Sequence, residues 1–213
     1  MRDSNEKNSF DPKVVDFMLA EYELLRQVRA ADIAQGDTRT NLFLGLVSGA
    51  VALLAVTSQI SKDPKSLSII SVIILTALFL LGLMTYIRLV ERIIIVTFYT
   101  RGMNRIRRFF SELDPSINKF LILPTRDNTP KYFRDEAKKR IGLRGIVAVL
   151  NSIIAACSVF NLLAILFSQN LYTWVKLVIS LSVLIVVLVA LEKYSVTRLR
   201  LQEEKASVEF PQE

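Results

Sequence analysis

Residues 88–144 read RLVERIIIVTFYTRGMNRIRRFFSELDPSINKFLILPTRDNTPKYFRDEAKKRIGLR, and they are the one long polar segment between hydrophobic runs. This segment holds 14 of the chain's 27 lysines and arginines but only 6 of its 20 acidic residues. Apolar runs at 42–60 and 67–87 precede it, and others at 145–167 and 171–191 follow. As a helix, each run can cross the roughly 30 Å hydrocarbon core of a bilayer. We therefore expect an all-α integral membrane protein with four transmembrane helices.

The apolar runs pair into two hairpins, because only a few polar residues separate the members of each pair. We expect five parts, which are a cytosolic N-terminal segment (1–41), a first transmembrane hairpin (42–87), a basic cytosolic segment (88–144), a second hairpin (145–191) and a cytosolic tail (192–213). Of the 27 lysines and arginines, 24 lie in the termini and the central segment. Since basic residues are retained on the cytoplasmic side, both termini should face the cytoplasm and the protein should lie in the cell membrane.

Composition limits the chemistry that the chain can perform. The sequence has no histidine and a single cysteine, Cys157, inside an apolar run. A Ser/His/Asp triad is excluded, and the usual thiolate and imidazole ligands of a zinc site are missing. No pair of carboxylates stands at the end of an apolar run in an acid/base arrangement. We expect a non-enzymatic protein without a metal or other cofactor.

Helical patterns continue the apolar runs into the polar parts. Asp-Pro at Pro12 is typical of a helix start, and Gly36 is a place where this first helix could loosen. Residues 88–113 are amphipathic at a helical period. Thr129-Pro130 predicts the start of another helix, after an extended piece at 120–123. We expect these helices to cover one another as a cytosolic bundle, with the first contributing an apolar stripe of Val15, Met18, Tyr22 and Leu25.

Charged residues gather where the apolar runs meet the central segment and the termini. Inward-facing charges at a dry boundary need partners, so at least one of Arg88 and Arg92 should pair with an acid (Asp32, Asp37 or Glu192). The cluster could form a gate or an anion site, or it could be a structural clasp. Its members are Arg29, Asp32, Asp37, Arg39, Arg88, Arg92, Arg144 and Glu192.

Small and polar residues mark two further faces of the apolar runs. Gly45 and Gly49 form a GxxxG pattern, which suits either a dimer interface or packing within one chain. Asn151, Ser158 and Asn161 share a face of the third run. They could line a pore or form hydrogen bonds between helices.

Arginines follow one side of the predicted helix at 88–113. Arg101, Arg105 and Arg108 lie opposite its apolar stripe, where they could contact lipid headgroups or remain solvated. No aromatic residues alternate with them as a nucleic-acid stacking surface would require, so we expect no nucleic acid as a partner.

The order of elements near the N-terminus resembles a known group of proteins. An amphipathic helix, Pro12–Gln35, leads through Arg39-Thr40-Asn41 into the first apolar run. This layout, over about the first 90 residues, is similar to that of small bacterial SLATT and Pycsar-type transmembrane effectors, which usually have two spans. The resemblance implies an oligomer that perturbs the membrane when triggered.

We therefore expect a membrane sensor, scaffold or membrane-perturbing effector that forms homo-oligomers and can bind a protein partner on its cytosolic side. A passive channel or the accessory subunit of a transporter is the alternative. A lipid-modifying enzyme has the least support.

Overall fold

A computed structural model describes residues 11–60, 63–133, 142–167 and 172–208. Within these residues it contains four long α-helices, one short 3-10 helix and no strand. The elements are α1 (Pro12–Ile60), α2 (Pro64–Leu113), η1 (Pro115–Phe120), α3 (Leu143–Leu166) and α4 (Thr173–Lys205). All four α-helices are long and apolar enough to cross a membrane, as the apolar runs predicted.

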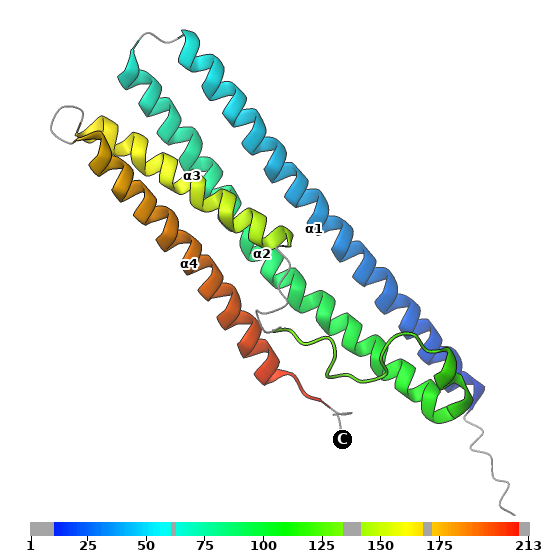
Figure 1. Ribbon diagram of the computed structural model, residues 1–213. Coiled ribbons are helices and arrows are strands. Elements are labelled where there is room, and N and C mark those ends of the chain that lie inside the picture. Colours follow the sequence, from blue (N-terminus) through cyan, green and yellow to red (C-terminus); the bar gives the residue numbers. More distant parts are fainter. Residues whose placement is uncertain (1–10, 61–62, 134–141, 168–171, 209–213) are drawn as a thin grey trace, which may run out of the picture.

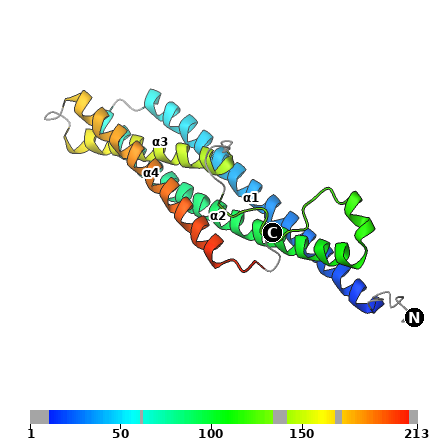
Figure 2. The same cartoon turned by 60° about the horizontal axis from the view of Figure 1, so that its bottom comes forward.

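The helices form an elongated layer in which α2 is central (Figure 1). Helix α2 packs along both α1 and α3, and α3 also packs along α4. The start of α1 and the end of α4 lie toward the same end of the molecule, opposite the end of α1 and the start of α4 (Figures 1 and 2). We call the end that carries the start of α1 the polar end and the opposite one the apolar end. Helix α3 begins halfway along α2, so the polar half of α2 needs other cover.

Aspartate–proline pairs set the helix boundaries. Asp63 precedes α2, and its carboxylate accepts hydrogen bonds from the backbone N–H groups of Lys65 and Ser66. Asp114 ends α2 and caps η1 by accepting from the N–H of Ser116. At the start of α1, Asp11 accepts from the N–H of Lys13 in the same way. The carboxylates satisfy backbone donors that the first helical turn leaves free.

Helix α1 is continuous through Gly36, so the expected loosening at this residue was wrong. The glycine has a different role. A Cβ atom built on Gly36 would collide with the guanidinium of Arg92 on α2. Gly36 therefore allows the two helices to approach closely around that arginine.

The apolar core lies at the middle of the molecule, where all four helices meet. Phe43 of α1, Tyr86 of α2, Val147 of α3 and Leu191 of α4 belong to one buried cluster. The hydroxyl of Tyr86 donates to the backbone carbonyl of Leu191 over 2.8 Å, which satisfies the polar atom of a side chain that is fully buried. This contact joins the two hairpins.

The segment between η1 and α3 differs from the prediction. No helix starts at Pro130, and residues 121–133 form neither a helix nor a strand. Of the extended piece expected at 120–123, Phe120 ends η1 and Leu121 has an extended backbone. The backbone carbonyls of Thr129 and Pro130 accept from side chains of α2 instead of from later N–H groups of their own segment. Tertiary contacts thus replace the helix that the Thr-Pro pair predicted; the rest of that helix, 134–141, lies outside the described residues.

Candidate functional site at the polar end

Two ion pairs link helices at the level where the apolar halves begin. The Nη1 atom of Arg92 lies 3.0 Å from Oδ1 of Asp37, so this pair joins α2 to α1. It is one of the pairs that the sequence predicted. Arg144 of α3 and Glu192 of α4 lie 3.5 Å apart and join the second hairpin. Each pair ties together the two helices of an antiparallel couple.

The other charged residues of the predicted cluster do not all lie in one place. Arg88 was expected to face inward, but its side chain is 66% exposed and pairs with Glu91 on the same helix. Arg88 and Arg92 line a cavity of about 110 Å³ between α1 and α2, together with Asp32 and Arg39. Arg29 does not lie with them, because it lines a second cavity closer to the polar end.

Close packing of α2 and α3 occurs at a glycine that no motif identifies. Asn151 is fully buried, and a Cβ atom on Gly82 would collide with its side-chain amide and lie 2.9 Å from Cζ of Phe43. By contrast, a Cβ atom on Gly45 or Gly49 would meet nothing within 4 Å. The GxxxG face of α1 is therefore open rather than packed against other described residues.

The polar residues of α3 have three different environments. The Ser158 hydroxyl lies 3.1 Å from the Thr76 hydroxyl of α2, which is an interhelical hydrogen bond. Asn161 donates to the carbonyl of Cys157 within its own helix. The amide N and O atoms of Asn151 are buried and have no hydrogen-bond partner among the described residues. The three side chains thus do not form one continuous polar path.

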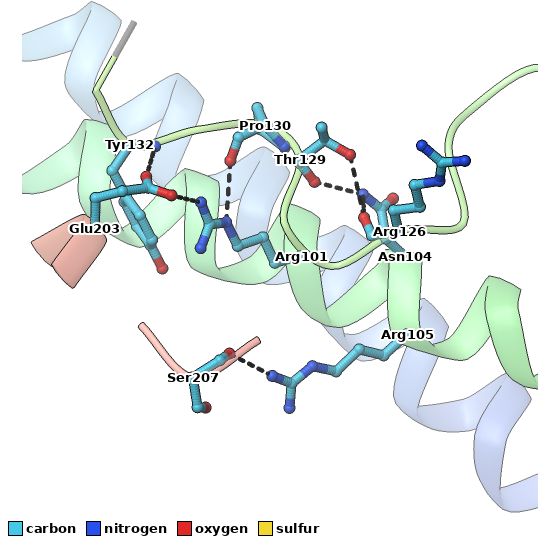
Figure 3. A network of polar contacts seen from close by, with 9 residues as sticks. All are labelled: Arg101, Asn104, Arg105, Arg126, Thr129, Pro130, Tyr132, Glu203 and Ser207. Carbon is cyan, nitrogen blue, oxygen red and sulfur yellow. Dashed lines mark hydrogen bonds and ion pairs between the residues drawn. The ribbon is translucent and has the colours of Figure 1, made fainter. Parts of the chain in front are cut away.

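Arg101 of α2 is the centre of a polar network that connects three parts of the chain (Figure 3). Its Nη2 atom lies 2.7 Å from Oε1 of Glu203 on α4, and its Nε donates to the carbonyl of Pro130. The guanidinium also lies over the Tyr132 ring, 4.3 Å from the ring centroid. The other Glu203 oxygen accepts from the backbone N–H of Tyr132 over 2.6 Å. We call the arrangement of Arg101, Pro130, Tyr132 and Glu203 the latch.

Neighbouring residues of α2 hold the same segment in place (Figure 3). Nδ2 of the fully buried Asn104 donates to the carbonyls of Arg126 and Thr129. Nε of Arg105 lies 2.9 Å from the carboxylate of Asp127, and its Nη2 donates to the carbonyl of Ser207. These contacts cover the polar half of α2 that α3 leaves uncovered.

Tyr132 is a buried residue of the latch. Burial raises the pKa of the Tyr132 phenol above its ordinary value, and the nearby positive charge of Arg101 opposes this effect.

Arg101 is only 5% exposed. Its predicted position on a lipid-facing or solvated stripe was therefore wrong, and Arg105 is largely engaged with Asp127 and Ser207. Arg108 remains partly exposed beside Glu112 on its own helix, and contact of Arg108 with lipid headgroups stays a prediction.

The latch connects α2, α4 and the segment between η1 and α3. In the described part of the chain, no three His, Cys, Asp or Glu residues lie close enough to hold a metal ion. The latch residues Tyr132 and Glu203 and the neighbouring Asn104 were missed by sequence reasoning. The sequence gives a signal only for Asn104, which is an uncharged polar residue among the arginines of α2 and has no obvious partner there.

Comparisons of the chain with protein-family models, with curated proteins and with solved structures found no match. The fold alone defines the class, which is an all-helical chain with four helices capable of crossing a membrane.

Proposed function

We propose that this chain is a non-enzymatic multi-pass membrane protein that acts as a sensor or effector, in which the cytosolic ends of the helices control the transmembrane part. The observation that carries the proposal is the latch. Glu203 on α4 holds Arg101 on α2 and the backbone of Tyr132, and both helices continue without a break into their apolar halves. A change at the latch is thus transmitted along rigid helices.

The proposed topology has both termini and the polar end in the cytoplasm of the cell, with two transmembrane hairpins. The charge distribution of the sequence supports it, because 24 of the 27 lysines and arginines would then be cytoplasmic. Single-cysteine variants in a Cys157→Ala background test this topology. A membrane-impermeant thiol reagent applied to intact cells should label Lys65→Cys and leave Asn118→Cys unmodified. Labelling of the Asn118→Cys variant from outside would contradict the proposed orientation.

We propose further that the protein forms a homo-oligomer through α1. Among the described helices, this one packs extensively along α2 alone. Its two span glycines, Gly45 and Gly49, present a face on which a Cβ atom would meet nothing. Small residues allow helices to approach closely in a bilayer, where van der Waals packing drives association. A second copy of α1 is therefore a suitable occupant, and the polar end remains accessible to a protein partner.

A passive channel formed by one chain has less support. A pore through the chain would need a continuous polar lining. Asn151 is fully buried against Gly82, and Ser158 is engaged with Thr76. These contacts support helix packing as the role of the polar face.

Dye release from proteoliposomes tests the control of the membrane part by the latch. Glu203→Gln removes the charge that holds Arg101, while Glu204→Gln removes the same charge from an exposed neighbour on α4. We expect faster release of an encapsulated dye from Glu203→Gln than from wild type, and unchanged release from Glu204→Gln. A measured loss of thermal stability in Glu203→Gln would show that the latch is broken. Equal release from all three proteins, together with that loss, would contradict the proposal.

A further inference from the structure

A second cavity at the polar end has an unusual distribution of charge. It lies between α1, α2 and the irregular segment, and its volume is about 490 Å³. Three cationic side chains line it, and none of its lining residues is acidic; the cations are Arg29, Arg107 and Lys131. The cavity near Arg92 differs, because Asp32 and Glu91 offset part of the charge of its three arginines.

The cations of this cavity lack carboxylate partners among the described residues. The Nε atom of Arg29 is buried and has no hydrogen-bond partner there. Arg107 is held by neutral groups, since its Nη1 donates to Oδ1 of Asn104 and its Nη2 to the hydroxyl of Tyr22. Arg29 and Arg107 are half-buried, and a cation that is partly removed from water without a counter-charge is costly. A bound anion would supply that charge, and the fixed guanidinium of Arg107 would bind it with little loss of conformational freedom.

The other walls of the cavity indicate the rest of the ligand. The hydroxyl groups of Thr100 and Thr129 donate to the backbone carbonyls of Val96 and Arg126, so the cations are left as the donors to a ligand. Apolar surface comes from Met103, Leu123, Pro124 and Pro130. The volume is in the range of small-molecule sites, about 300–1,000 Å³. From these features we infer that the cavity binds a small molecule that carries a phosphate group on a compact apolar body.

The position of the cavity favours a soluble ligand over a lipid headgroup, an argument that rests on the proposed membrane topology. Arg29 precedes the apolar run that begins at Leu42, and at about 1.5 Å per residue the distance along α1 is roughly 20 Å. The headgroup layer extends only about 5–8 Å beyond the hydrocarbon on each side. Headgroup phosphates therefore do not reach the cavity.

The ligand would contact the segment that the latch also holds. The cavity is lined in part by Thr129, Pro130 and Lys131. In the latch, the carbonyl of Pro130 accepts from Arg101, and the backbone N–H of Tyr132 donates to Glu203. Binding would thus fix this segment and act on α4 through two residues of chain. The site would be the input of the proposed sensor.

Isothermal titration calorimetry of the full-length protein in phosphatidylcholine nanodiscs tests the site. The probes are inorganic phosphate and phenyl phosphate, which differ only in the apolar group. We expect saturable binding of both, with phenyl phosphate binding more tightly. Arg29→Gln and Lys131→Gln should each weaken binding about tenfold, because each removes a charged hydrogen-bond donor. Arg198→Gln removes the same charge from an exposed position on α4 and should change the affinity by less than about twofold.

Three results would overturn the inference: no saturable binding of either probe by the wild type, equal weakening by Arg198→Gln, or binding that both cavity variants retain. Retention of phosphatidylglycerol that depends on Arg29, without binding of the soluble probes, would assign the cavity to a lipid headgroup. Two cavity variants keep the test decisive if one fails to fold. Binding without any effect on dye release would leave the site intact and contradict the proposed function alone.

Discussion

The contact between Gly82 of α2 and Asn151 of α3 predicts a measurable coupling. Alanine at position 82 would place a Cβ atom against the buried amide of Asn151 and 2.9 Å from Cζ of Phe43. Both neighbours are almost fully buried, so they cannot move aside. Overpacking of this kind costs about 1–3 kcal/mol, and we expect Gly82→Ala to lower the free energy of unfolding by that amount.

Asn151→Ala should relieve the clash. Alone, it removes two amide atoms that lack partners among the described residues and leaves a small cavity, and these effects oppose each other. In the double variant the methyl group added at position 82 occupies the vacated space. We therefore expect a coupling energy of about 1–2 kcal/mol between the two substitutions.

Unfolding by sodium dodecyl sulfate in mixed micelles, followed by circular dichroism, would measure this cycle. The control is Gly45→Ala, since a Cβ atom there meets nothing within 4 Å. Its effect on the monomer should be neutral or stabilising by up to about 1 kcal/mol, because alanine favours a helix over glycine. Additive effects of Gly82→Ala and Asn151→Ala within about 0.5 kcal/mol would refute the close contact.

Two further predictions concern the polar end. Gly36→Ala should displace Arg92 from Asp37 and cost about 0.5–1 kcal/mol, a modest value because Asp37 is half exposed. In an Arg92→Met background the same substitution should be neutral or stabilising, as for Gly45→Ala, and a persistent loss of stability there would show another cause. Since burial raises the pKa of the Tyr132 phenol, its neutral form contributes stability that is complete below the ordinary tyrosine pKa of about 10 and declines as the pH rises above it. Thermal midpoints of wild type should therefore fall more steeply between about pH 9 and 11, by about 1–2 °C, than those of Tyr132→Phe, and parallel curves would contradict this.

The sequence predicted the helices well because their signals are local. Uncharged runs such as 42–60 and the Asp-Pro pair at Asp114 depend only on neighbouring residues. The failure at Pro130 has the opposite cause. Its segment is held by Arg101 and Asn104 of α2, and such distant contacts override local propensity.

The candidate site was predictable only in part. Helical period placed Arg101 and Arg105 opposite the apolar stripe, but it does not say what covers a face. The cover comes from Asp127, Tyr132 and Glu203, far along the chain. Similarly, the GxxxG motif identified Gly45, whereas the glycine packed tightly in an apolar half is Gly82, whose partner Asn151 lies on another helix.

The unbroken course of α1 gives the molecule mechanical leverage. Its polar part, from Pro12 to Asn41, is about 45 Å long at about 1.5 Å per residue. Helix α2 runs antiparallel to it, and the two are joined toward both ends of this part, by Arg92 with Asp37 and by Arg107 with Tyr22, so they move as a pair. A tilt of this pair by about 5° around the level of Asp37 would move the far tip by about 3 Å, more than half of one helical turn. Small rotations among the apolar halves would thus become larger displacements at Tyr22 and its neighbours. In the other direction, a force applied at that tip would act on the apolar halves with a greater magnitude.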